Sequence, residues 1–266
     1  MKFSLYLQIA KNTWDESVAY RTSFVIFRLR EVLQLFATYF IWFFVTSPTE
    51  GFFGYTQSMM LTYVLVGTFV NDVIFATRTT HIASEINEGT LTNYLIRSLS
   101  YLKYHFARDF GDKAMNIVFS LGELTLLILI LHPPVVFQTN IVTLLLFLLS
   151  LALGLILHFF ISVLISLIGF WSNEGWGPRF IFYQAIGFFS GALFPLDLLP
   201  KPIFTFFQAL PFSYLTFFPT KLYLGQLSLQ EIFIGFGVLI IWILLMSRIT
   251  LFVWSRGLKV YTAQGR

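Results

Sequence analysis

The sequence predicts an all-α integral membrane protein with six transmembrane helices. Of its 266 residues, 57% are hydrophobic and only 11% are charged, whereas about 25% of the residues in a soluble domain are charged. Runs of about 20 apolar residues recur along the chain, and a helix of this length crosses a hydrocarbon core about 30 Å thick. We therefore treat residues 1–266 as a single transmembrane domain.

The six apolar segments follow one another with polar or proline-containing connections between them. We place them at residues 32–45 (extended backward into 24–29), 58–77, 114–131, 142–170, 180–194 and 232–254. Arg28, Arg30 and Glu31 interrupt the first segment, and we expect them near the interface, where long side chains reach water. The fourth segment is longer than a membrane requires, which favours a tilted helix.

The basic residues are distributed unevenly over the connections between these segments. If both termini are cytosolic, all of the 17 Lys and Arg residues except Lys201 and Lys221 fall on the cytosolic side. Cytosolic loops carry an excess of basic residues, so we expect this orientation. Because the basic residues are scattered between apolar segments, they indicate topology rather than binding to nucleic acid.

The N-terminal region, residues 1–23, reads as a helix on the cytosolic membrane surface. Leu5, Ile9 and Trp14 recur at a spacing close to that of one helix face. Trp14 and Tyr20 are residue types that favour a membrane interface. The alternative is an ordinary cytosolic turn of helix.

The longest polar connection, residues 79–113, is predicted to contain a short helix over residues 90–97. Thr90 is a suitable N-cap, and Leu91, Tyr94 and Leu95 form one apolar stripe at helical spacing. A short amphipathic helix of this kind suits docking into a groove on another protein. The alternative is a plain connector that lies on the lipid surface.

The region 193–225 breaks a membrane helix with prolines just after the fifth segment. Pro195, Pro200 and Pro202 have no backbone N–H to donate, so they interrupt helix hydrogen bonding. Irregular backbone at membrane depth is tolerated where it is buried in protein or lines a watery cavity. We expect two short helices, at about residues 193–199 and 201–209, that form a re-entrant hairpin held at the outer surface by Asp197 and Lys201. The alternative is a simple outer loop with an interfacial helix.

Three ionisable residues fall inside apolar segments, where such groups are functional candidates. Glu123 lies in the third segment, His158 in the fourth, and Asp72 late in the second. We consider Glu123 and His158 as candidates for a transport pathway. The alternatives are a packing role, a hydrogen bond between helices, or ion coupling in a secondary transporter.

The sequence carries no motif for chemistry on this chain. It has no cysteine, no G-x-x-x-x-G-K-[ST] phosphate loop, and no H-E-x-x-H or G-x-S-x-G pattern. We therefore expect no catalytic residue, bound metal or cofactor here, and we expect any ATP hydrolysis on a partner.

Several motifs resemble those of ABC-2 type permeases, and the resemblance covers nearly the whole chain. "EINEGTLTNYLIRSLS" (residues 85–100) is similar to the coupling helix that follows the second span in that family, and "SGALFPLDLLPKPIFTFFQALPFSYLTFFPTKLYLG" (residues 190–225) to its second outer-side signature. "AYRTSFVIF" (residues 19–27) and "GLKVYTAQG" (residues 257–265) resemble a bacterial branch of the family.

The resemblance implies a permease subunit of an ATP-binding cassette transporter, in a superfamily that consists mostly of exporters. It implies a dimer with a second copy or a related permease in a bacterial cytoplasmic membrane, in contact with its lipids, and two separate ATPase subunits that bind ATP and Mg²⁺. The alternatives are an ion-coupled secondary transporter or a membrane structural or assembly protein.

The resemblance also assigns expected roles to two sets of residues. The expected ATPase-coupling residues are Glu85, Glu88, Gly89, Thr90, Leu91, Tyr94, Leu95 and Arg97. The expected outer re-entrant gate comprises Phe194, Pro195, Asp197, Pro200, Pro202 and Pro211.

Overall fold

The structure is a computed structural model that describes residues 2–19, 21–49, 51–97, 99–172 and 176–262. Within these ranges the chain forms helices joined by turns, with two isolated bridges between residues 47 and 55 and no strand. This confirms the predicted all-α class. Tyr20 and the last residues of the C-terminal motif, 263–265, lie outside the described residues.

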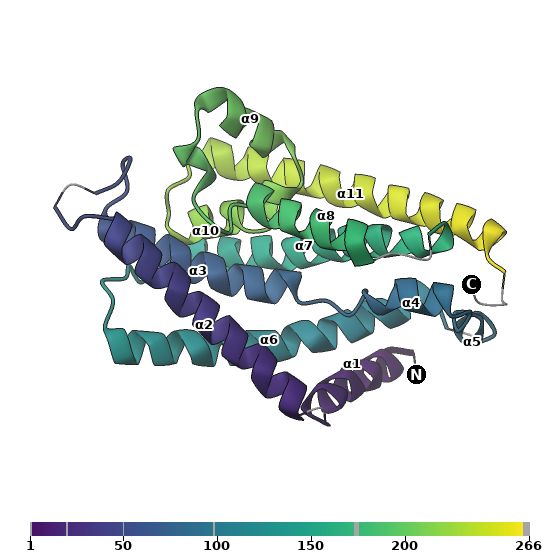
Figure 1. Ribbon diagram of the computed structural model, residues 1–266. Coiled ribbons are helices and arrows are strands. Elements are labelled where there is room, and N and C mark those ends of the chain that lie inside the picture. Colours follow the sequence, from purple (N-terminus) through teal and green to yellow (C-terminus); the bar gives the residue numbers. More distant parts are fainter. Residues whose placement is uncertain (1, 20, 50, 98, 173–175, 263–266) are drawn as a thin grey trace.

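Four helices of the described chain are long and apolar enough to cross a membrane. They are α3 (Gln57–Phe75), α6 (Tyr101–Leu131), α7 (Ile141–Ser166), which continues into the 3-10 turn η1 (Leu167–Phe170), and α11 (Leu229–Val260). These correspond to the second, third, fourth and sixth predicted segments. In Figure 1 they run roughly alongside one another, with α4 (His81–Asn87), α5 (Thr92–Leu95) and the end of α11 together at one end of the bundle, the α5 end.

The first and fifth predicted segments also form helices, but neither helix is among these four candidate spans. α2 (Arg21–Val45) is one continuous helix of 25 residues despite the charges near its start, and it crosses the other helices at an angle (Figure 1). α8 (Trp176–Phe189) has only 14 residues, which is about 21 Å of helix. This is shorter than a hydrocarbon core about 30 Å thick. Six crossings therefore remain a prediction.

Local side-chain chemistry explains where three of the long helices begin. The Thr56 side chain accepts a hydrogen bond from the backbone N–H of Met59 at the start of α3, and Asn140 accepts two such bonds at the start of α7. At the start of α11, Ser228 and Glu231 form a reciprocal capping box. Each cap satisfies N–H groups that a helix leaves without partners in its first turn.

α6 extends much further toward its N-terminus than predicted and supports α1 (Lys2–Ala19). Its first 13 residues occupy a stretch that the sequence assigned to a connection. α1 packs against this part of α6, and an added Cβ at Gly111 would lie 2.3 Å from the carbonyl oxygen of Ala10. Glu16 also accepts a hydrogen bond from Arg108 at 3.0 Å. α1 therefore packs on protein, and its contact with a membrane surface remains a prediction.

The main core lies between α3, α7, α11 and the short helix α10 (Phe217–Tyr223). Val70 and Ile74 of α3, Leu157 of α7, Leu222 of α10 and Leu239 of α11 are all buried there. A second core, around Leu91, Phe159 and Phe170, lies under α4 and α5. These two cores join the long helices to the segments that carry the candidate sites.

The proline-rich region contains three short elements toward the end of the bundle opposite α5. They are the 3-10 turn η2 (Leu196–Leu198), the helix α9 (Lys201–Ala209) and the 3-10 turn η3 (Phe212–Tyr214). The bounds of α9 agree with the second helix of the predicted hairpin, whereas the first is a single turn. Pro195, Pro200 and Pro211 are the residues that immediately precede these elements, and Pro202 lies in the first turn of α9. The prolines therefore start helical turns, where a missing N–H is harmless.

Candidate functional site

The turn between α4 and α5 is held by its own backbone. Gly89 adopts φ of +75°, in the left-handed region that favours glycine. This reversal lets the N–H of Leu91 donate to the carbonyl oxygen of Glu85 at 2.9 Å, and the Thr90 hydroxyl donates to the same oxygen at 3.3 Å. The residue that precedes α5 is Leu91 rather than Thr90, so Thr90 closes the turn instead of capping the helix.

Glu85 anchors α4 to α6 through a buried carboxylate. Its Oε2 accepts a hydrogen bond from the Tyr101 hydroxyl and lies 3.1 Å from Nε2 of His105, whose side chain is fully buried. Burial alone would raise the pKa of the Glu85 carboxyl, but the hydrogen bonds from His105 and Tyr101 and the nearby charge of Arg108 outweigh burial and lower this pKa below its usual value. The carboxylate is therefore stable in its ionised form.

The chain segment after α11 clamps the same turn from the other side. The Tyr261 hydroxyl donates to the carbonyl oxygen of Gly89 at 2.7 Å and lies 3.3 Å from the backbone N of Thr92. The Tyr101 ring stacks on Trp254 of α11 with centroids 5.0 Å apart. α4 and α5 are thus connected to both α6 and α11.

The predicted apolar stripe divides into a buried part and an exposed part. Leu91 is fully buried in the core under α4 and α5, and Tyr94 is half-buried against the Tyr101 ring. Leu95 is 43% exposed and Ile96, which the sequence did not single out, is 79% exposed. Burial corrects the expectation of one continuous docking stripe, because Leu91 has no surface to offer a partner. The exposed apolar tip of this region consists of Leu95 and Ile96.

The expected coupling residues thus take three kinds of position. Glu85 and Leu91 are buried, Gly89, Thr90 and Tyr94 are half-buried in the turn, and Glu88 and Arg97 are exposed.

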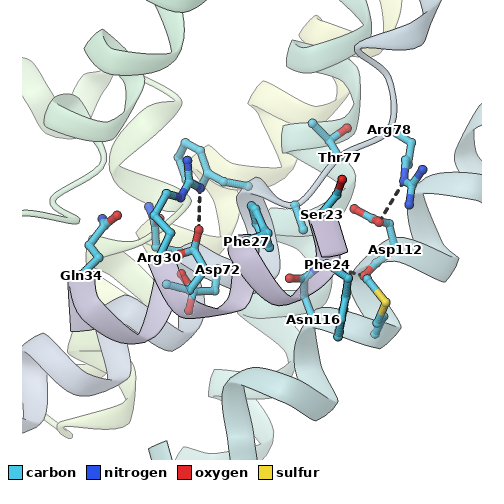
Figure 2. Close-up of a pocket in the computed structure, with 15 residues that line it drawn as sticks. Ser23, Phe24, Phe27, Arg30, Gln34, Asp72, Thr77, Arg78, Asp112 and Asn116 are labelled. Carbon is cyan, nitrogen blue, oxygen red and sulfur yellow. Dashed lines mark hydrogen bonds and ion pairs between the residues drawn. The ribbon is translucent and has the colours of Figure 1, made fainter. Parts of the chain in front are cut away.

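A cavity of about 650 Å³ lies between α2, α3 and α6. Its walls combine aromatic rings, among them Phe24 and Phe27, with amide and charged groups that include Asp72 and Asn116, as Figure 2 shows. A ligand pocket typically measures about 300–1,000 Å³ and combines apolar walls with a few polar groups. The cavity is therefore a candidate site for a small molecule.

The arginines around the cavity are each paired with a carboxylate. Two of these pairs line the cavity: Arg30 with Glu31 at 2.6 Å and Arg78 with Asp112 at 3.0 Å. The third, Arg28 with Glu123 at 3.5 Å, lies just behind the wall.

Asp72 is the fourth carboxylate around the cavity, and none of these three arginines forms an ion pair with it. Its Oδ2 accepts a hydrogen bond from Ser120 at 3.2 Å, and no cationic side chain of the described residues lies within ion-pair distance of it. Arg28 is close enough to attract Asp72, but its guanidinium is already bound by Asn116 and Glu123.

A charged network joins the proline-rich region to neighbouring segments. Lys221 of α10, which is only 7% exposed, donates to Asp197 Oδ2 at 2.8 Å and to the Tyr55 hydroxyl at 2.9 Å. The Tyr55 hydroxyl in turn donates to the Asp197 carboxylate. Lys201 is exposed at the start of α9, and the cationic partner of Asp197 is Lys221. The network joins the loop between α2 and α3, η2 and α10.

Apolar contacts also hold the proline-rich region against its neighbours. Leu196 is fully buried and packs with Tyr63, Phe207 and Phe217, and Phe194 lies partly buried against the same cluster. The Tyr63 hydroxyl donates to the carbonyl oxygen of Gly191 at 2.8 Å.

A comparison with known families decides the class of the chain. Residues 32–265 match the family described as ABC-2 family transporter protein. The chain belongs to this family. It is therefore a multi-pass membrane permease of an ABC transporter, and membership implies association with ABC ATPase subunits. No curated protein matches the chain significantly.

The permease places its two predicted pathway residues away from the cavity wall. Glu123 is bound by Arg28 behind the wall, and its side chain is 10% exposed. His158 is fully buried, with its ring 4.9 Å from that of Phe75 and 6.2 Å from that of Tyr183. Both residues pack inside the helix bundle, and neither lines this cavity.

The sequence singled out Asp72 as a functional candidate, but none of the other residues that build the permease's cavity. Asn71 and Asp72 form an adjacent polar pair inside an otherwise apolar segment, and Asn116 lies one turn into the next. Three such interruptions in neighbouring segments are a signal that could have located the site. The pairing partners could not be read from the sequence, since Arg28 and Glu123 are 95 residues apart.

Proposed function

We propose that this permease is the membrane half of an ATP-driven exporter in a bacterial cytoplasmic membrane. In this arrangement α2 and α8 complete six crossings, and both termini are cytosolic. The distribution of Lys and Arg supports the orientation, because it places the α5 end in the cytosol. ATP and Mg²⁺ would be bound by separate ATPase subunits.

The observation that carries the proposal is the exposed tip formed by Leu95 and Ile96 on a rigid support. Large exposed apolar side chains outside the membrane mark protein–protein contacts. We propose that a groove of the ATPase receives this tip, with Glu88 and Arg97 at its rim. The buried residues Glu85 and Leu91 would hold the tip in place rather than touch the partner.

The contacts of α4 and α5 suggest how the movement would be transmitted. Glu85 connects α4 to α6, Tyr261 connects the turn to the end of α11, and Gly169 of η1 approaches the backbone of Ala83. Pressure on the tip would therefore displace α6, α7 and α11 together. On the outer side, the proline-rich region would act as a re-entrant gate that the Lys221 network keeps closed.

We also propose that the working unit contains two permeases, either two copies or this chain with a related one. The outward face of α2 supports this: Val25, Leu29 and Leu33 are 61%, 57% and 61% exposed. Such a face requires either lipid or a second helical surface.

The docking proposal is tested by changing the tip without changing its support. With a co-expressed ATPase, Ile96→Glu should abolish co-purification and stimulated ATP hydrolysis while membrane insertion is unchanged, because a charge at the centre of an apolar contact is strongly unfavourable. The matched control Ile96→Val keeps an apolar side chain and should retain coupling.

Leu91→Ala should act differently from Ile96→Glu, since it creates a cavity in a core and lowers the free energy of unfolding by about 2–5 kcal/mol. Normal ATPase binding and transport by Ile96→Glu would refute the assignment of the tip.

The second candidate function is ion-coupled secondary transport, which the unpaired Asp72 in the cavity favours. Transport in vesicles that contain an ion gradient but no ATP or ATPase would establish it. A structural or assembly protein would show neither ATP-driven nor gradient-driven transport.

A further inference from the structure

The cavity between α2, α3 and α6 has one acidic side chain, Asp72, more than the arginines around it pair with. We propose that Asp72 and the surrounding aromatic side chains bind a lipophilic organic cation, and that such cations are the cargo class of this permease. The cargo assignment rests on the transport function proposed above, whereas the binding site stands on the cavity itself.

Charge is the first argument for a cation. The three arginines nearest the cavity are each engaged by a carboxylate, so no free positive charge of the described residues faces an incoming ligand. Asp72 is left with the Ser120 hydroxyl, which donates a hydrogen bond to it at 3.2 Å. A carboxylate in a low-dielectric site attracts a compensating cation strongly.

The second argument comes from the side chains that line the cavity, and it concerns the apolar part of the ligand. Phe24, Phe27 and Phe75 line the cavity together with Met115. The rings of Phe24 and Phe27 already lie 5.7 and 5.1 Å from the guanidinium carbon of Arg28, so this wall accommodates positive charge. Aromatic and thioether surfaces suit a bulky apolar group around the cationic centre.

The volume and the position of the cavity narrow the class of ligand further. A volume of about 650 Å³ fits a compact small molecule and excludes a polymer held along its length. Asp72 lies in the last turn of α3 and Phe24 in the first turn of α2. In the proposed orientation both are close to the cytosol, which is the side from which an exporter takes up its cargo.

The proposal is tested with probes that match in shape and differ in charge. The purified full chain in lipid nanodiscs is titrated with tetraphenylphosphonium, tetraphenylborate and neutral triphenylphosphine oxide, with empty nanodiscs as the reference for partition into lipid. We expect saturable binding of the phosphonium cation alone.

Two variants of Asp72 and one control variant outside the cavity wall locate the bound charge. Asp72→Asn keeps the shape and the contact with Ser120 but removes the charge, and it should weaken phosphonium binding by at least about tenfold, which is 1.4 kcal/mol. Asp72→Glu keeps the charge and should retain binding. Asp15→Asn removes an exposed carboxylate of α1 that does not line the cavity and should leave the affinity unchanged.

The outcomes separate this inference from the proposed ATP coupling. Saturable borate binding, absence of saturable phosphonium binding, or an unchanged affinity in a folded Asp72→Asn variant would each overturn the cation site. If Ile96→Glu fails to uncouple the ATPase while the phosphonium cation still binds, the docking proposal is wrong and the cation site stands.

Discussion

At the residue scale, Glu85 is a buried charge whose Oε2 is bound by two side chains of α6. Two side chains of α6 and the backbone of the α4–α5 turn meet at this residue. A buried carboxylate without such partners would be strongly unfavourable. Its role is therefore structural, and it acts on coupling through the rigidity of the turn.

The depressed pKa of Glu85 predicts a pH dependence with a definite sign. Because the pKa is lower in the folded than in the unfolded protein, the carboxylate stabilises the folded form above the usual pKa of 4.5. This stability is lost as the pH falls through the folded-state pKa. Glu85→Gln should remove about 1–3 kcal/mol at neutral pH and flatten the response to acid. Hydrogen exchange of the α4 and α5 amides measures both effects.

Glu88→Gln is the matched control, since Glu88 is an exposed carboxylate on the same turn. Equal losses of protection in the two variants would show that the buried network contributes nothing special.

At the element scale, the approach of α1 to α6 depends on a single missing methyl group. Gly111→Ala would place a Cβ 2.3 Å from the carbonyl oxygen of Ala10, so α1 must move and its ion pair between Glu16 and Arg108 must break or stretch. We expect a lower thermal unfolding temperature and faster proteolysis of α1.

The same helix offers a control for this substitution. Gly122 has open space around the position of an added Cβ, so Gly122→Ala should be neutral or stabilising by up to about 1 kcal/mol, as expected for alanine in a helix. If both variants behave alike, the close contact between α1 and α6 is not important for stability.

Element boundaries were predictable where they depend on apolar length alone. α3, α7 with η1, and α11 begin within about three residues of the predicted segments, because a membrane-length apolar run and a capping residue are local features. The start of α6 was not predictable, since its polar first turns become helical by packing against α1 and α4. Leu91 could not be separated from Leu95, because its burial depends on Phe159 and Phe170, which lie far along the chain.

At the scale of the whole molecule, the structure combines a tightly packed proline-rich region with a cavity at the C-terminal end of α3. Leu196 is fully buried, whereas Leu193, three residues earlier, is 55% exposed. Lys221 binds the carboxylate of Asp197, the residue that follows Leu196. An exporter in this state would accept cargo from the cytosol while its exit is blocked.

Cysteine labelling from the outside tests this arrangement, because the chain has no cysteine of its own. Leu196→Cys should be protected from a membrane-impermeant maleimide at rest and should react when ATP drives transport. Leu193→Cys serves as the accessible control and should react in both conditions. A Leu196→Cys variant that reacts equally with and without ATP would show that this segment does not open during the cycle.

The ion pair between Arg28 and Glu123 also has a consequence for how the protein is made. A guanidinium is unfavourable by about 2.5–3.5 kcal/mol at the centre of a membrane helix and by less toward its ends, where Arg28 lies, and its partner follows 95 residues later. At about 5–20 residues per second, α2 waits roughly 5–20 s before α6 can neutralise it. We expect α2 to stay beside the insertion machinery during this interval, so that stalled nascent chains ending before Glu123 cross-link to it and longer ones do not.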